Sequence, residues 1–185
     1  MIYFISDNHW GHKAIIFMQN RPFHDIMEMN KSMIESWNSV VKPDDEVYYL
    51  GDLSYKMNGN LLSMILSKLN GKIYLIRGNH DKDRVINKCI NRFEWIKDYY
   101  TFNYEYNDKN YKFVLFHYPI WSWEGIWRGS IHICGHTHDN SKHYFENHPG
   151  RIFNVSCEMI NYKPISIIDI INIMKEKVVI PPPKN

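Results

Sequence analysis

The chain has 185 residues, of which 44% are hydrophobic and 23% charged, and its formal net charge is +2. This length and composition predict one globular domain over residues 1–185, and so small a charge does not by itself indicate nucleic-acid binding. The three cysteines are far apart and form no CxxC pair, which argues against a disulfide framework and is typical of the reducing cytosol. No stretch approaches the roughly 18 apolar residues of a membrane span, so we expect a cytoplasmic protein without a membrane partner.

The first half of the chain alternates apolar strand patterns with helical patterns. Strands are predicted over residues 1–5, 46–50 and 72–76, and helices over residues 14–19, 30–41, 61–69 and 83–93. Such an alternation is typical of a parallel sheet with crossover helices. The first half therefore indicates the α/β class.

The second half changes to shorter strand patterns. Strands are predicted over residues 95–97, 101–106, 112–116, 131–134 and 151–155, with a hairpin-type turn at 107–110. Ser166 and Asp169 match a capping box that opens a last helix to about residue 175. Residues 178–180 form a candidate edge strand before the prolines that end regular structure.

Five of the predicted strands end directly in residues that can bind a metal ion. These residues are Asp7 and His9, Asp52, Asn79 and His80, His117, and His136 and His138. In open α/β sheets, functional groups collect beyond the carboxyl ends of the strands, so these segments are expected to converge. Glycines at positions 51, 78 and 135 directly precede three of the segments and allow positive φ and close backbone approach.

The spacing within two of these segments favours shared metal binding. Residues two apart in an extended chain point to the same side, so Asp7 and His9 can reach one ion. His136 and His138 have the same relation and can serve one ion or two neighbouring ions. Carboxylate, imidazole and amide ligands without a thiolate suit Mn, Fe, Zn or Co better than a structural zinc site. Taken alone, Asp7 and His9 also fit a capped turn, and Asn79 fits a helix cap.

The five segments DxH, GD, GNHD, H and GHTH, in this order from Asp7 to His138, resemble the calcineurin-like metallophosphoesterases. The opening SDNHWGHKAII followed by NRPF is similar to a small bacterial and phage subgroup of predicted phosphoesterases. The resemblance implies a four-layer α/β fold, in which two packed mixed β-sheets are flanked by α-helices.

The resemblance also implies a centre with two divalent transition-metal ions, Mn first and Fe, Zn, Co or Ni as alternatives. Its ligands would be Asp7, His9 and His138 for one ion, Asn79, His117 and His136 for the other, and Asp52 as the bridge. Two such ions activate a water to hydroxide and stabilise an in-line displacement at phosphorus. His80 would stand near the leaving group as general acid or charge stabiliser.

Two positions depart from the pattern of the phosphoprotein phosphatases in this family. They usually carry an acid three residues after the GD aspartate, to support the catalytic histidine, and here that position is Tyr55. Asp81 stands where those phosphatases have glutamate, which makes a phosphoprotein substrate less favoured. The sequence leaves open what orients His80.

Two further residues are candidates for substrate contacts. His12 follows the first metal-ligand pair and is expected to face the substrate or support the ligands, with plain helix-start packing as the alternative. Arg21 is a candidate phosphate contact, because a guanidinium pairs well with phosphate oxygens.

The sequence therefore predicts a metal-dependent phosphoesterase acting on a small phosphodiester or phosphomonoester, such as a nucleotide. One alternative is a nuclease, which should show a basic groove and is not favoured by the near-neutral charge. The other is a metal-binding scaffold without catalytic activity. The sequence does not indicate an oligomeric state.

Overall fold

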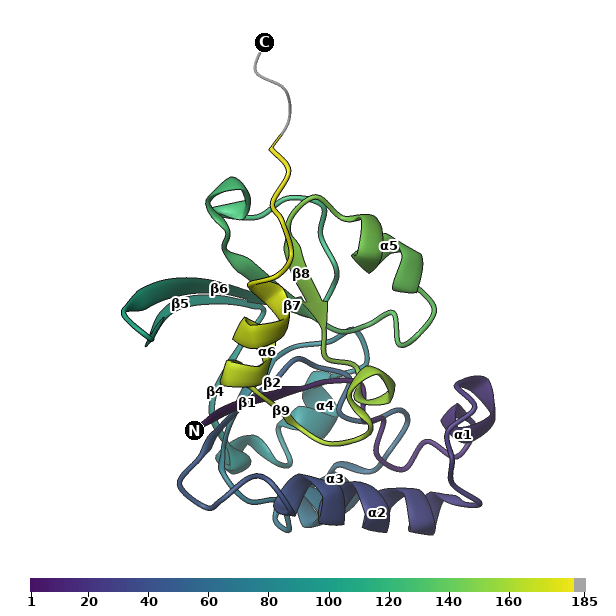
Figure 1. Ribbon diagram of the computed structural model, residues 1–185. Helices are drawn as coiled ribbons and strands as arrows, with labels where there is room; N and C mark the ends of the chain where they lie inside the picture. Colours follow the sequence, from purple (N-terminus) through teal and green to yellow (C-terminus); the bar gives the residue numbers. More distant parts are fainter. Residues whose placement is uncertain (182–185) are drawn as a thin grey trace.

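The computed structural model describes residues 1–181 as two β-sheets with helices outside them (Figure 1). The first sheet has the strand order β4-β3-β2-β1-β9, with β1 at Ile2–Ile5, β2 at Glu46–Tyr49, β3 at Lys72–Ile76, β4 at Phe93–Lys97 and β9 at Ile165–Ser166. The second sheet has the order β5-β6-β7-β8, with β5 at Tyr99–Tyr106, β6 at Lys109–Phe116, β7 at Ile131–Cys134 and β8 at Arg151–Asn154. The predicted four-layer α/β arrangement is confirmed.

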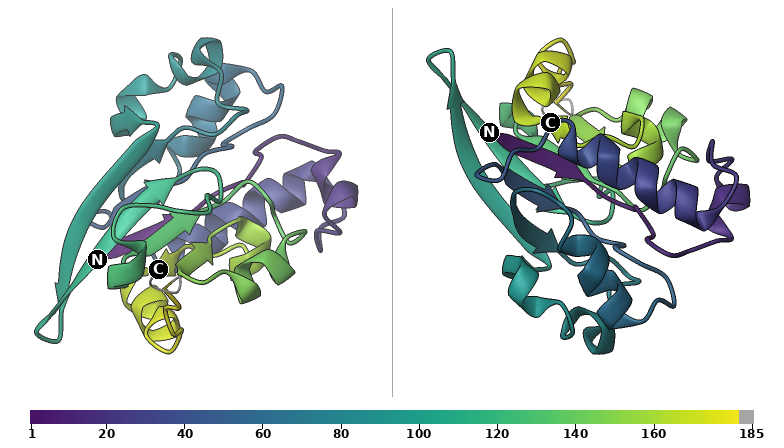
Figure 2. Two further views of the ribbon diagram at one scale, coloured as in Figure 1. Left: turned by 90° about the horizontal axis from the view of Figure 1, so that it is seen from above. Right: turned by 90° about the horizontal axis from the view of Figure 1, so that it is seen from below.

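Both sheets are mixed. Strands β1 to β4 run parallel and β9 runs antiparallel to β1. In the second sheet β6, β7 and β8 run parallel, and β5 pairs antiparallel with β6 as a long hairpin along one side of the molecule (Figure 2). Asn107 and Asp108 connect this hairpin with positive φ at both positions, 50° and 58°, as a two-residue type I′ turn requires.

The helices lie on the outer faces of the two sheets. Helices α2 (Ile26–Asn38) and α3 (Gly59–Leu66) lie below the first sheet in Figure 1, whereas α5 (Lys142–Asn147) and α6 (Ile167–Met174) pack against β8. The short helices α1 and α4 cover Ile15–Met18 and Asp83–Ile86. Within residues 1–181, no helix has the length and apolar character needed to cross a membrane.

The core lies between the sheets and is rich in stacked aromatic rings. Phe4 of β1 stacks on Tyr48 of β2 at 5.6 Å between ring centroids and on Phe113 of β6 at 6.0 Å. Phe4 and Phe113 are fully buried. These contacts join the two sheets, so the loops at their carboxyl ends are held at a fixed separation.

Most predicted elements are present, with shifted ends. The predicted bounds of β3 and β7 agree with the structure. Helix α2 begins four residues earlier than predicted, because the side chain of Asp25 caps it by accepting from the backbone N–H groups of Met27 and Glu28 at 2.8 and 2.9 Å. The capping box at Ser166 is confirmed, since its hydroxyl accepts from the backbone N–H of Asp169 at 3.1 Å.

The predicted helix over residues 83–93 is wrong beyond Ile86. Residues Ile90–Arg92 form one 3-10 turn, and Phe93 begins β4 by pairing with Ile73. The guanidinium of Arg92 donates to the carbonyls of Leu66 and Leu69, which anchors the segment to the end of α3. These long-range contacts outweigh the local helical pattern.

Three smaller differences concern short elements. Helix α5 and the two-residue strand β9 were not predicted, because neither has enough residues to show a periodicity. Residues 178–180 form no strand in the described part of the chain. There the N–H of Ile180 donates to the carbonyl of Pro149 at 3.0 Å.

We predict that Phe4→Ala lowers the free energy of unfolding by about 3–5 kcal/mol, because it opens a cavity between the two sheets. Phe17→Ala is the matched control, since Phe17 is 74% exposed and its loss should change stability by less than about 0.5 kcal/mol. Urea unfolding followed by fluorescence measures both. Equal effects of the two substitutions would contradict the packing described here.

Candidate metal centre

The loops that follow five strands meet at one place. They follow β1, β2 and β3 of the first sheet and β6 and β7 of the second. The parallel pairing of β1 with β2 continues into two of these loops: the N–H of Asp7 donates to the carbonyl of Gly51 at 3.0 Å, and that of His9 to the carbonyl of Asp52 at 3.2 Å. The expected convergence of the five segments is therefore present.

Several residues at this place have an unusual backbone conformation. Five of them are non-glycine residues with positive φ: Asp7 (57°), His9 (50°), Asp52 (54°), His136 (73°) and His138 (50°). Left-handed φ is rare for such residues, costs about 1–3 kcal/mol each and persists only where the surrounding structure imposes it. Strain of this kind is concentrated at functional sites.

Glycines allow the loops to approach one another, as predicted. Gly51 has a φ of +88°, and a Cβ there would collide with the backbone of Gly78. A Cβ on Gly78 would collide with the carboxylate of Asp52, and one on Gly135 with that of Asp7. Positive φ is needed only at Gly51 among these three, whereas close approach is needed at all of them.

Asp7, His9 and His138 form the first candidate metal group, with one ligand atom from each lying within 4.8 Å of the others. Oδ2 of Asp7 accepts from the hydroxyl of Ser156 and the N–H of His136, both at 2.9 Å. Among the described residues, Oδ1 of Asp7 and both ring nitrogens of His9 are buried without a hydrogen-bond partner. Such atoms are costly to bury alone, and a cation would satisfy them.

His9 has the protonation state that metal binding needs. Burial, together with the nearby His138 and Arg21, lowers its pKa to about 2. The ring is therefore neutral and keeps a lone pair.

Asp52, His117 and His136 form the second candidate group, again within 4.8 Å. Oδ1 of Asn79 lies 3.1 Å from Nε2 of His117 and 3.0 Å from Nδ1 of His136. Nδ1 of His117 donates to the carbonyl of Leu50 at 2.7 Å, because a carbonyl can only accept, so in its neutral form the ring would turn a lone pair towards the Asn79 oxygen. A cation between these atoms would remove the repulsion. The donor set of both groups thus fits divalent metal ions.

Asp52 lies between the two groups. Its Oδ2 is 3.7 Å from Nε2 of His9, and its Oδ1 is 3.7 Å from Nε2 of His117. Burial raises the pKa of Asp52 to about 6 against the opposing effect of His117. A buried carboxylate facing ligands of both groups is what a bridging role requires.

Asp81 holds two of the loops together. Its carboxylate accepts from the backbone N–H groups of Asp52 and Leu53 at 2.9 Å each and of Gly78 at 2.8 Å. It is buried, so its role is to position Asp52 rather than to contact substrate.

Glu158 was missed by the sequence reasoning and supports the first group. Its Oε1 accepts from Nδ1 of His138 at 3.0 Å and from the guanidinium of Arg21 at 2.6 Å. Burial lowers the pKa of His138, but the hydrogen bond to Glu158 and the negative charges of Asp7 and Glu158 together raise it above its ordinary value. A carboxylate behind a ligand imidazole orients the ring and makes it more basic.

The expectation that Arg21 contacts phosphate is wrong. Its side chain is fully buried and pairs with Glu158. It also donates to the carbonyls of Asp7 at 2.8 Å and Asn8 at 2.7 Å. Arg21 therefore holds the loop of the first group in place instead of facing the substrate.

His12, Tyr55 and His80 form an aromatic cluster with His9. Tyr55 packs on His12 at 4.5 Å and edge-on against His80 at 4.9 Å, and His9 lies 5.6 Å from His12 and 5.4 Å from His80 between ring centroids. Within residues 1–181 the ring of His80 makes no side-chain hydrogen bond. Tyr55, at the position where phosphoprotein phosphatases carry an acid, thus contacts His80 by aromatic packing.

The seven residues predicted as ligands and His80 all lie at this site, and their roles stay predictions. A cavity of about 480 Å³ opens here and is lined by His9, His12, Ala14, Ile15, Met18, Gln19, Asp52, Tyr55, Asn79, His80, His136 and His138. His12, predicted to face the substrate or support the ligands, is among the residues that line this cavity.

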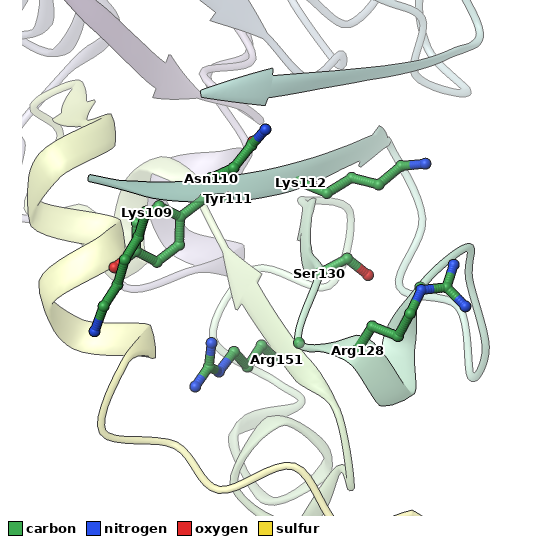
Figure 3. Close-up of a pocket in the computed structure, with 9 residues that line it drawn as sticks. Lys109, Asn110, Tyr111, Lys112, Arg128, Ser130 and Arg151 are labelled. Atoms are coloured by element: carbon green, nitrogen blue, oxygen red, sulfur yellow. The ribbon is translucent and has the colours of Figure 1, made fainter. Parts of the chain in front are cut away.

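A separate basic cavity lies at the opposite ends of the strands (Figure 3). Its cationic residues are Lys109, Lys112, Arg128 and Arg151. Lys109 begins β6, whereas His117 follows the other end of that eight-residue strand. The charges therefore form no groove that leads to the candidate metal centre.

Comparison with known proteins gives the family. Residues 1–140 match the model of the calcineurin-like phosphoesterases. The chain belongs to the calcineurin-like phosphoesterase family. It is also 42% identical, over 178 residues, to an uncharacterized protein of Methanocaldococcus jannaschii, covering 95% of this chain and 92% of that protein. The resemblance drawn from the five motifs is confirmed.

Two further relatives of this phosphoesterase chain are a phage protein and a solved structure. Gene 66 protein of Mycobacterium phage L5 is 34% identical over 88 residues, which cover 46% of this chain and 42% of that protein. The crystal structure of a protein of unknown function from Aquifex aeolicus superposes with a TM-score of 0.71 and 28% identity, covering 94% of this chain and 98% of that one.

We predict that Glu158→Gln weakens Mn²⁺ binding about tenfold, because the charge behind His138 is lost while the shape is kept. Isothermal titration calorimetry on metal-stripped protein measures this affinity. Glu105→Gln on β5 is the matched control, since Glu105 is exposed. Unchanged affinity in Glu158→Gln would show that Glu158 does not act on the metal centre.

Proposed function

We propose that this protein hydrolyses a small phosphate ester, a diester or a monoester, with two divalent metal ions. The observation that supports this is the position of Asp52, whose carboxylate faces a histidine of each candidate metal group at 3.7 Å. Asp7, His9 and His138 would hold one ion, Asn79, His117 and His136 the other, and Asp52 both. Mn²⁺ is our first choice, because the ligands are oxygen and imidazole without a thiolate.

When bound, two divalent ions would lower the pKa of a coordinated water and stabilise negative charge on phosphate oxygens. Residues of the chain orient the side chains that would bind these ions. Hydrogen bonds to Leu50 and Glu158 fix the tautomers of His117 and His138. Oδ2 of Asp7 is held by hydrogen bonds, which leaves its Oδ1 free for a cation.

His80 is the proposed proton donor to the leaving oxygen. Its backbone N–H donates to Oδ1 of Asp52 at 2.9 Å, and its Nε2 lies 3.8 Å from Oδ2 of the same carboxylate. The ring is 34% exposed at the cavity, so it can meet a substrate while Tyr55 restrains its orientation. Small phosphorylated compounds, nucleotides included, fit an open cavity of about 480 Å³.

Metal-stripped protein should be incubated with Mn²⁺ and with p-nitrophenyl phosphate, bis(p-nitrophenyl) phosphate or single-stranded DNA. We expect Mn²⁺-dependent hydrolysis of at least one nitrophenyl ester and none of the DNA, because the basic cavity lined by Lys109, Lys112, Arg128 and Arg151 lies at the opposite ends of the strands from the site. Cleavage of the DNA would favour a nuclease. No hydrolysis at all, with Mn²⁺ shown to be bound, would favour a scaffold without catalytic activity.

We predict that His80→Ala lowers kcat about 10²–10⁴-fold and leaves the number of bound metal ions unchanged, since His80 is not a proposed ligand. Steady-state kinetics and elemental analysis measure the two quantities. His143→Ala is the matched control, because His143 is exposed on α5. Full activity of the His80 variant would overturn the proposed role.

A further inference from the structure

The cavity at the candidate metal centre has two chemically different walls. The inner wall consists of the polar side chains that would bind metal. The outer wall comes from the segment around α1, with Ala14, Ile15, Met18 and Gln19, and from the rings of His12 and Tyr55. The outer wall is mostly apolar and aromatic.

Helix α1 holds this wall firmly although it is only four residues long. Ile15 and Ile16 are buried in the core. The segment is tied at both ends, since the N–H of Ile15 donates to the carbonyl of His12 at 3.2 Å and that of Arg21 to the carbonyl of Ile16 at 2.8 Å. Arg21 is in turn fixed by its ion pair with Glu158. The wall is therefore built into the same network as the first metal group.

Met18 belongs to this wall but is not packed into the core of the fold. It is 65% exposed yet lines the cavity, whereas the neighbouring Phe17 is 74% exposed and does not line it. Exposed apolar surface is unfavourable in water, so a ligand that covers it binds more tightly. A thioether also adapts to the edge or face of an aromatic ring.

The rings of Tyr55 and His12 complete a surface suited to a flat group. Their centroids lie 4.5 Å apart, and the ammonium of Lys56 lies 5.0 Å from the Tyr55 ring centroid. Asp52 is the single acidic residue among the described residues of this lining, and it faces the ligand histidines. A cationic group on the substrate would therefore find no carboxylate among the described residues of the outer wall.

We infer that Met18, Tyr55 and His12 bind the organic group of the substrate and select phosphate esters whose organic group is aromatic. This inference rests on the proposed function, because it places the phosphate at the metal centre and the organic group against α1. It adds a preference that the metal centre alone cannot provide, since the ions would contact only the phosphate.

Benzylphosphonate and methylphosphonate test this preference, because they carry the same phosphonate group and resist hydrolysis. Isothermal titration calorimetry on the Mn²⁺-loaded protein gives the affinity of each. Wild type should bind benzylphosphonate about tenfold or more tightly than methylphosphonate, since its phenyl ring covers apolar surface. Met18→Ser should lower this ratio severalfold, because the rings of Tyr55 and His12 remain, whereas Met18→Leu should keep it.

Phe17→Ser is the matched control on the same helix and should leave the ratio as in wild type. Equal affinity of wild type for the two phosphonates would overturn the apolar subsite but not the proposed phosphoesterase function. An unchanged ratio in Met18→Ser would overturn the role of α1. Failure of both phosphonates to bind would count against the proposed function as well.

Discussion

The candidate site depends on the pairing of β1 with β2 beyond the ends of the strands. Hydrogen bonds from Asp7, His9 and Trp10 to the carbonyls of Gly51, Asp52 and Leu53 keep the two loops side by side. This pairing places His9 next to Asp52, and three residues later in each loop it places His12 next to Tyr55. One backbone register thus sets both the contact between the candidate metal groups and the aromatic wall of the cavity. This arrangement requires strained, positive φ values at Asp7, His9 and Asp52.

Buried charged side chains hold the loops of the candidate metal centre in place. Asp81 binds three backbone N–H groups from the loops after β2 and β3. Arg21 and Glu158 join the carbonyl of Asp7 to the ring of His138, although Arg21 and Glu158 are 137 residues apart in sequence. Removing one partner of such a buried pair leaves an unpaired charge, which is strongly destabilising. The proposed ligand positions are therefore fixed by residues that would themselves contact neither metal nor substrate.

The sequence predicted the place of the ligands because each one follows a strand within a short motif. It could not predict Glu158, which lies in the 3-10 turn Cys157–Ile160 and outside any such motif. The sequence also suggested the wrong role for Arg21, because only the folded structure shows that its guanidinium is buried. Likewise, the helical pattern of residues 83–93 gave no sign that Arg92 would anchor to α3 and that Phe93 would join a sheet. Local patterns predicted most of the elements, whereas long-range contacts decided where the helix that begins at Asp83 ends.

The central claim is that Asp52 joins two metal ions. Electron paramagnetic resonance during titration of metal-stripped protein with Mn²⁺ tests it most directly, because two ions that share a carboxylate are magnetically coupled. We expect binding to saturate at two Mn²⁺ per chain, with a coupled spectrum that is lost in Asp52→Asn. Saturation at one ion, or two ions with uncoupled spectra in the wild type, would contradict the account.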